Sequence, residues 1–247
     1  MKWRVVELET YDACMNMALD EVAGESVRNS SIPTIRFYNY KPSAVSIGYF
    51  QGIRDEVNLE ICRELGIDCV RRFTGGGAVF HDCEGEITYS VAAPLNIFPK
   101  NIIESYRIIC GWIVSGLERI DIKAEFRPVN DILVGGKKIS GSAQTRRGGV
   151  LFQHGTLLYN LDLETMFSVL NVSRQKISGK MIKDARERVT CISNHCDAGK
   201  EDVYEALVRA FTKGKDFEIG TWSRDELTMA RELALKKYGS DEWMYLR

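Results

Sequence analysis

Several features that would indicate other protein classes are missing from this sequence of 247 residues. It has only five prolines and no repeat or Pro/Ser-rich run, which argues against a flexible linker between domains. No apolar stretch approaches the roughly 18 residues of a membrane span, and the N-terminus reaches Glu7 before any signal-peptide-like run. The 33 basic and 34 acidic residues nearly balance, so the composition gives no general reason to expect binding to nucleic acid or to anionic membranes. We therefore expect a soluble, cytoplasmic protein without a nucleic-acid or membrane partner.

The cysteines lack the pattern of a disulfide framework. There are seven, an odd number, and none forms a CxxC pair. Scattered cysteines of this kind are typical of a reducing compartment, which agrees with a cytoplasmic location.

Hydrophobic periodicity and turn residues predict a mixture of helices and strands. The apolar residues behind Asp12, a plausible N-cap, recur at helical spacing, and a second apolar stripe is the clearest helix of the chain. The order of elements lacks regular βαβ alternation, which favours an α+β fold with a mixed, largely antiparallel sheet. We expect one catalytic domain over residues 1–247, with helices at 13–27, about 57–65 and 102–119, strands at 34–38, 44–48 and 69–72, and a helical C-terminal segment over about 201–247.

Two glycine pairs predict β-hairpins. Gly135-Gly136 lies between strand-like residues 131–134 and 137–140, and Gly148-Gly149 lies between residues 143–147 and 150–153. Paired glycines supply the positive φ angles that tight hairpin turns need.

The first segment that carries chemistry is Arg-Arg-Phe-Thr-Gly-Gly-Gly at residues 71–77, followed by His81. Glycines let the backbone approach a ligand and direct its N–H groups at an anion, and arginine adds a fork of donors for carboxylate or phosphate. An ordinary glycine-rich turn with solvated arginines would have the same composition. The spacing matches neither GxGxxG nor GxxxxGK[ST], so Rossmann and P-loop functions are disfavoured.

The second segment begins with Asn130-Asp131 and continues through Lys137-Lys138 into small residues. A carboxylate suits a hard cation such as Mg²⁺, and a lysine held in a hairpin could stabilise charge on a phosphate. Taken alone, two adjacent lysines are most often solvated.

The third segment, residues 153–160, places His154 and Thr156 on an expected strand beside that hairpin. A lone histidine in such a position is usually a satisfied residue of the sheet.

In their order and spacing, these segments resemble the lipoate-protein ligase family, which forms a larger group with biotin ligases and octanoyltransferases. The family motifs Arg-Arg-x-x-Gly-Gly-Gly-x-Val-x-His, Asn-Asp then Lys-x-Ser-Gly-Ser-Ala, and His-Gly-Thr-Leu-Leu are all matched. Similarity extends to residues 16–21, 47–51, 186–190 and 241–243, so it covers nearly the whole chain.

The resemblance implies a biotin/lipoate ligase-like α+β fold and a reaction in two steps. Lipoate and ATP, with Mg²⁺, would give lipoyl-adenylate and pyrophosphate. A lysine of an acceptor protein would then attack the adenylate. The implied acceptors are lipoyl domains of proteins of the 2-oxoacid dehydrogenase or glycine cleavage type.

The motif positions also imply roles for individual residues. Lys138 would be catalytic, because it would stabilise the charge that develops on the carboxyl and phosphate groups. Asp131 is the expected Mg²⁺ ligand. The residues expected to bind substrate or adenylate are Arg72, Gly75, Gly76, Gly77, His81, Asn130, His154 and Thr156.

Two alternative functions stay open at this stage. Some relatives carry an octanoyl group from acyl carrier protein on a cysteine, without ATP, and this cysteine lies either shortly before the lysine hairpin or after the His-Gly strand. Residues 126–131 and 157–190 contain no cysteine, and Cys191 is the nearest candidate. The other alternative is a non-catalytic lipoate-binding protein, against which the intact motifs argue.

An accessory chain is a further expectation. Many ligases that the chain resembles continue into an additional C-terminal domain, whereas this sequence stops at residue 247, directly after its last expected helix. We expect that domain to be absent here and a separate accessory subunit to supply it.

Overall fold

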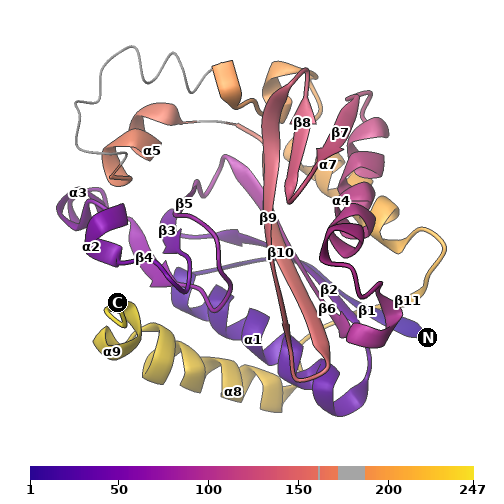
Figure 1. Ribbon diagram of the computed structural model, residues 1–247, viewed down its shortest axis with the longest axis horizontal. Coiled ribbons are helices and arrows are strands. Elements are labelled where there is room, and N and C mark those ends of the chain that lie inside the picture. The colour runs from indigo at the N-terminus through magenta and orange to yellow at the C-terminus, as the bar shows by residue number, and fades with distance from the viewer. Residues whose placement is uncertain (161, 172–186) are drawn as a thin grey trace.

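The computed structural model of the protein describes residues 1–160, 162–171 and 187–247. Its main feature is an eight-stranded sheet in the order β11-β1-β2-β6-β10-β9-β8-β7, and a second sheet has the order β4-β3-β5 (Figure 1). The strands are β1 (Lys2–Tyr11), β2 (Thr34–Tyr40), β3 (Ala44–Ile47), β4 (Asp68–Arg71), β5 (Val79–His81), β6 (Glu86–Pro94), β7 (Ala124–Arg127), β8 (Asp131–Val134), β9 (Lys137–Arg147), β10 (Val150–Leu158) and β11 (Asp216–Gly220).

Helices cover both faces of the large sheet (Figure 1). α4 and α7 pack on one face, and α1 and α8 pack on the other. The helices are α1 (Ala13–Ser30), α2 (Ile53–Glu56), α3 (Leu59–Glu64), α4 (Ile102–Glu118), α5 (Leu163–Val169), α7 (Lys200–Thr212), α8 (Arg224–Leu233) and α9 (Asp241–Met244), with 3₁₀ turns at Leu95–Ile97 and Ile192–Asn194 and a π-helical turn at Ala234–Tyr238.

The central strands are buried on both faces because helices cover both, and alternate side chains of a strand point into the two cores. Val5 on β1 packs into the core beneath α4 and α7, and its neighbour Val6 packs into the core against α1. The large sheet is mixed: β1 runs parallel to β2 and β11, and the other neighbouring strands among the described residues pair antiparallel. The expected α+β class with a largely antiparallel sheet is confirmed.

The first helix begins where the sequence predicts. The Asp12 carboxylate accepts a hydrogen bond from the Met15 N–H at 2.8 Å, which is the expected N-cap. The helix continues to Ser30, beyond the predicted end at residue 27, until Ser31 adopts a left-handed φ of 60° and its N–H donates to the Val27 carbonyl.

Both predicted hairpins are present. Gly135 and Gly136 have φ angles of 56° and 78°, and Gly148 and Gly149 have 57° and 75°, as two-residue hairpin turns require. The prediction was wrong in dividing the chain between them into two strands, because residues 137–147 form the single long strand β9.

The C-terminal segment that we expected to be helical contains α7 and α8, and it also contains a strand that the sequence did not predict. Within residues 201–247, β11 pairs in parallel with β1 at the edge of the large sheet. Its five residues, Asp-Phe-Glu-Ile-Gly, are too few and too polar to stand out in the sequence. The partner strand supplies hydrogen bonds that local sequence cannot reveal.

The smaller sheet packs with α2 and α3 through a separate apolar core that includes Val45, Ile53 and Cys62. Residues 186–190 are one of the segments that resemble the family, and residue 186 lies outside the described residues. None of the described helices is both long and apolar enough to cross a membrane.

Candidate active site

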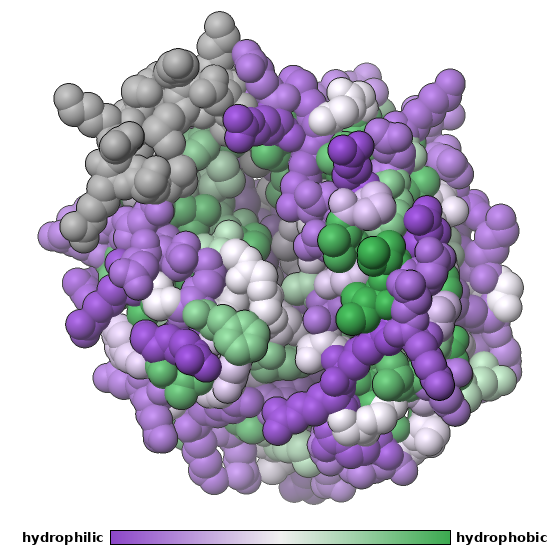
Figure 2. All heavy atoms as spheres, in the orientation of Figure 1, coloured by the Kyte–Doolittle hydropathy of each residue, from purple (hydrophilic) through white to green (hydrophobic). Residues whose placement is uncertain are grey.

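A cleft of about 340 Å³ lies between the smaller sheet and strands β9 and β10, and Figure 2 shows the hollow near the centre of this face. Its size is typical of a small-molecule site. Gly75 and Asp131 are not in its lining over the described part of the chain, although both belong to segments that form it. The other predicted site residues all line the cleft, namely Arg72, Gly76, Gly77, His81, Asn130, Lys138, His154 and Thr156.

The Arg72 side chain shapes the glycine-rich loop from inside. Its Nη2 donates to the carbonyls of Gly75 at 3.0 Å and Gly77 at 2.6 Å, and its Nη1 donates to the carbonyl and the hydroxyl of Ser46. Burial lowers the pKa of Arg72 to about 10, so the guanidinium remains cationic at neutral pH. Because four of its hydrogen bonds go to the protein itself, we interpret Arg72 as the support of the loop.

Arg71 does not point into the cleft. Its side chain is fully buried, and it donates to the carbonyls of Trp243 and Met244 in α9. It also donates to the carbonyls of Gly48, Tyr49 and Gln51. The first arginine of the motif therefore links α9 by hydrogen bonds to residues 48–51, the segment beside the glycine-rich loop.

His81 belongs to a chain of hydrogen bonds that begins at Arg72. The Ser46 hydroxyl accepts from the Arg72 guanidinium, and it lies 2.8 Å from His81 Nε2. His81 Nδ1 lies 2.7 Å from the Glu86 carboxylate, and it donates to that carboxylate because a carboxylate only accepts. The imidazole also stacks on the Tyr40 ring, with 4.2 Å between the ring centroids. These contacts fix His81 in one orientation on the cleft wall.

Lys138 and Asp131 face each other across the β8–β9 hairpin. The Lys138 Nζ lies 2.7 Å from the Asp131 Oδ1, and both side chains are partly exposed. The Asn130 amide donates to the Ser142 carbonyl at 2.6 Å, which connects the start of β8 to β9. The hairpin thus places one cation at the cleft, held by one carboxylate.

The same geometry limits how Mg²⁺ could bind. Asp131 offers a single carboxylate, already paired with Lys138, and the described residues contain no cluster of three His, Cys, Asp or Glu side chains that could hold a metal ion. Mg²⁺ commonly takes one or two carboxylates and completes its shell with substrate phosphates and water. Asp131 therefore fits an ion that arrives with a nucleotide.

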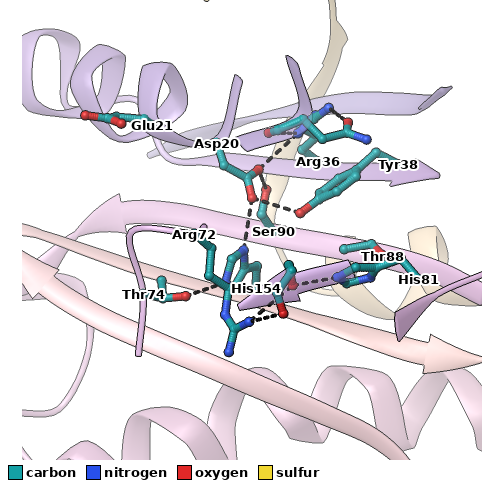
Figure 3. A network of polar contacts seen from close by, with 12 residues as sticks. Asp20, Glu21, Arg36, Tyr38, Arg72, Thr74, His81, Thr88, Ser90 and His154 are labelled. Carbon is teal, nitrogen blue, oxygen red and sulfur yellow. Dashed lines mark hydrogen bonds and ion pairs between the residues drawn. The ribbon is translucent and has the colours of Figure 1, made fainter. Parts of the chain in front are cut away.

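His154 lies at the buried end of the cleft, in a network that Figure 3 shows in close-up. Its Nδ1 lies 3.1 Å from the Asp20 carboxylate, and its Nε2 lies 2.7 Å from the Thr74 hydroxyl. Asp20 also forms an ion pair with Arg36 at 3.0 Å, and both side chains are fully buried. Thr156, two residues further along β10, lies on the same wall.

Protonation within this network follows from burial. Burial, together with the charges of Arg72 and His81, lowers the pKa of His154 more than the neighbouring Asp20 raises it, so the imidazole is neutral at pH 7. Burial acts to raise the pKa of Asp20, but the hydrogen bond from His154 and the charge of Arg36 outweigh it and lower the pKa. The pair is therefore an aspartate with a neutral histidine.

Sequence reasoning missed Asp20 as a site residue. It lies in the familial segment 16–21, one helical turn after Asn16, whose side chain caps backbone carbonyls of Tyr11 and Asn39. An acidic residue between apolar helix positions was the available signal, because a carboxylate on a buried helix face requires partners.

The sheet, the glycine-rich loop and the lysine hairpin together define an enzyme with the lipoate-ligase fold. A structure described as a bi-partite lipoate protein ligase with its E2 lipoyl domain from Thermoplasma acidophilum superposes with a TM-score of 0.91 at 33% identity, over 100% of this chain and 98% of that one. A lipoate-protein ligase A bound with ATP gives a TM-score of 0.85 at 33% identity, over 99% of both chains.

Sequence relatives include another activity. The octanoyltransferase LipM of Geobacillus kaustophilus is 34% identical, over 99% of this chain and 98% of its own length. Residues 12–212 match the lipoyl protein ligase A/B catalytic domain, and the chain belongs to that family. It is thus an enzyme that transfers acyl groups in the modification of proteins by lipoylation.

Proposed function

We propose that the chain is an ATP-dependent lipoate-protein ligase that forms lipoyl-adenylate and passes the lipoyl group to a lysine of a lipoyl domain. One observation carries the proposal: the cleft is lined by Lys138 and contains no cysteine among its described lining residues. All seven cysteines lie in the described part of the chain, so their positions relative to the cleft are known. Without a thiol nucleophile, activation of the carboxylate by a nucleotide is the remaining route in this family.

Cys110 contacts a residue of the cleft lining but is poorly suited to attack. Cys110 is fully buried on α4 behind Ser142, with 3.8 Å between its sulfur and the Ser142 hydroxyl. Burial raises the pKa of the Cys110 thiol to about 11, so the reactive thiolate is scarce at neutral pH. Cys191, the candidate that follows the His-Gly strand, is also buried.

The proposed chemistry needs charge stabilisation more than acid or base catalysis. In the first step a lipoate carboxylate oxygen attacks the α-phosphorus of ATP, and pyrophosphate leaves. Lys138 Nζ, fixed by Asp131, would balance the negative charge that builds up between carboxylate and phosphate. In the second step the acceptor amine attacks the acyl carbon, AMP leaves with the bonding electron pair, and the amine loses a proton.

The second candidate function is octanoyl transfer from acyl carrier protein, which the resemblance to LipM proteins of several bacteria favours. A comparison of donors separates the two functions. With an acceptor lipoyl domain, we expect lipoate plus ATP and Mg²⁺ to give lipoylated product with equal amounts of AMP and pyrophosphate. Octanoyl-acyl carrier protein without ATP should give none. Product from the thioester donor alone would show that the chain is a transferase.

We predict that no cysteine is essential. Replacing Cys83, Cys110 and Cys191 separately by serine should leave activity within the range that loss of stability explains, because the acyl group passes through a mixed anhydride. The measurement is turnover with lipoate and ATP, beside a thermal melt of each variant. A hydroxylamine-sensitive acyl-enzyme trapped at one of these positions would contradict the ligase and support the transferase.

We also predict that a separate accessory chain is required for full activity. The support is the bi-partite ligase of T. acidophilum. The similarity between the two structures extends over 98% of the length of that chain. Lipoylation by the purified chain should rise at least tenfold when extract of its source organism is added, because an adenylate must be kept from water until the acceptor binds. Boiled extract is the control. Full turnover by the purified chain alone would show that no partner is needed.

A further inference from the structure

We propose that Asp20 is a positioning residue for the glycine-rich loop. It holds His154 in one orientation, and His154 in turn holds the loop through Thr74. The inference rests on the proposed function only in naming lipoate as the ligand. The loop and the cleft are features of the fold.

The Asp20 carboxylate is itself held rigidly. Its Oδ1 accepts from Arg36 at 3.0 Å and from the Ser90 hydroxyl at 2.8 Å. Its Oδ2 accepts from the Tyr38 hydroxyl at 2.8 Å and lies 3.1 Å from His154 Nδ1 (Figure 3). Donors from β2, β6 and β10 thus converge on one fully buried carboxylate of α1, whose position is fixed by the sheet.

His154 transmits this position to the loop. Because Asp20 only accepts, His154 Nδ1 carries the proton, and Nε2 is left to accept from the Thr74 hydroxyl at 2.7 Å. Thr74 is fully buried and precedes the three glycines, and its carbonyl accepts from the Tyr49 N–H at 2.8 Å. The loop is therefore anchored by Thr74 on one side and by Arg72 on the other.

The direction of the Thr74 bond depends on His154 remaining neutral. A second proton would make Nε2 a donor, and the Thr74 hydroxyl would have to turn away or accept. Burial lowers the pKa of His154, Asp20 raises it, and the charges of Arg72 and His81 lower it again. The titratable or charged groups around this site are Asp20 from α1, Arg36 and Tyr38 from β2, Arg72 after β4 and His81 from β5.

The test compares Asp20→Asn, Thr74→Val and the double variant. The readouts are hydrogen exchange of the amides of residues 73–77 and the Kd for lipoate. Each single change should speed exchange and weaken binding by about fivefold or more, the factor expected for one net hydrogen bond. If Asp20 acts through Thr74, the double variant is no worse than the more damaged single variant. Multiplying effects would overturn the proposal.

The pH dependence of loop protection is a second readout, and it would not change in the variants if Asp20 had only a structural role. In the wild type, loop protection should fall as the pH drops below the ordinary histidine range of about 6.5. Asp20→Asn removes the charge that favours protonation, so this fall should move to lower pH. In Thr74→Val the fall should disappear. A pH profile of Thr74→Val equal to that of the wild type would count against the relay.

Ser90→Ala is the matched control. It removes another hydrogen bond to Asp20 but leaves the path through His154 to Thr74 intact. It should lower the melting temperature without changing exchange of residues 73–77. An equal effect of Ser90→Ala on the loop would assign Asp20 a general structural role. Asp20→Asn could fail to fold because Arg36 loses its partner. In that case, hydrogen exchange of residues 73–77 in Thr74→Val, measured as a function of pH, still tests whether His154 holds the loop through Thr74. Hydrogen exchange needs no substrate, so failure of the ligase proposal would leave this test valid.

Discussion

Replacing Lys138 by alanine should abolish pyrophosphate release from ATP and lipoate while leaving the fold intact. The Lys138 and Asp131 side chains are 43% and 33% exposed, and an ion pair this exposed contributes about 1 kcal/mol at most. Stabilisation of transition-state charge is worth far more, and loss of one such group typically lowers the rate about 10²–10³-fold. The measurements are single-turnover adenylation and a thermal melt.

Lys137→Ala is the matched control, because it removes the same charge from the adjacent residue of β9. It should retain most of the activity. Wild-type pyrophosphate release by Lys138→Ala would refute the catalytic assignment. Equal losses in both variants would point to a general effect of charge at the hairpin.

The second large effect is expected from Gly48→Ala. A Cβ atom at residue 48 would lie 2.0 Å from the Gly76 carbonyl oxygen, so the added methyl group must displace the glycine-rich loop. Overpacking of this kind costs about 1–3 kcal/mol. In a chain of this size that lowers the melting temperature by roughly 2–12 °C. Because the displaced loop lines the cleft, turnover should fall more steeply than stability.

Gly24→Ala provides the control, since an added Cβ at residue 24 of α1 meets nothing within 4 Å. Alanine is the better helix former by about 1 kcal/mol, so this variant should be as stable as the wild type or more so. If Gly48→Ala melted and turned over like Gly24→Ala, the close approach of the two segments would be disproved.

The site was predictable wherever chemistry requires particular residues in sequence. The glycine-rich segment and Lys138 line the cleft as the motifs predict. The pairing of Asp20 with His154 joins residues 134 positions apart, and no local pattern reveals such a contact. Arg71 and Arg72 are adjacent and chemically identical, yet Arg71, the last residue of β4, donates to a carbonyl of α9, whereas Arg72, which follows β4, donates to a carbonyl of the glycine-rich loop.

The fold was predictable where periodicity or turn chemistry is strong, as in α1, α4 and the two glycine hairpins. The sequence did not predict strands that form mainly because a neighbouring strand pairs with them. β6 is buried on both faces and reads Glu-Ile-Thr-Tyr-Ser-Val-Ala-Ala-Pro, without the alternation that identifies a half-buried strand. β11 exists because β1 offers a parallel edge.

The contacts of Arg71 have a further consequence for how the molecule opens. One buried guanidinium donates to carbonyls of α9 and of the segment beginning at Gly48, so separation of either segment breaks hydrogen bonds of a charged donor. We therefore expect α9 and the segment beside the binding loop to open together, as one cooperative unit, although about 190 residues of chain separate them.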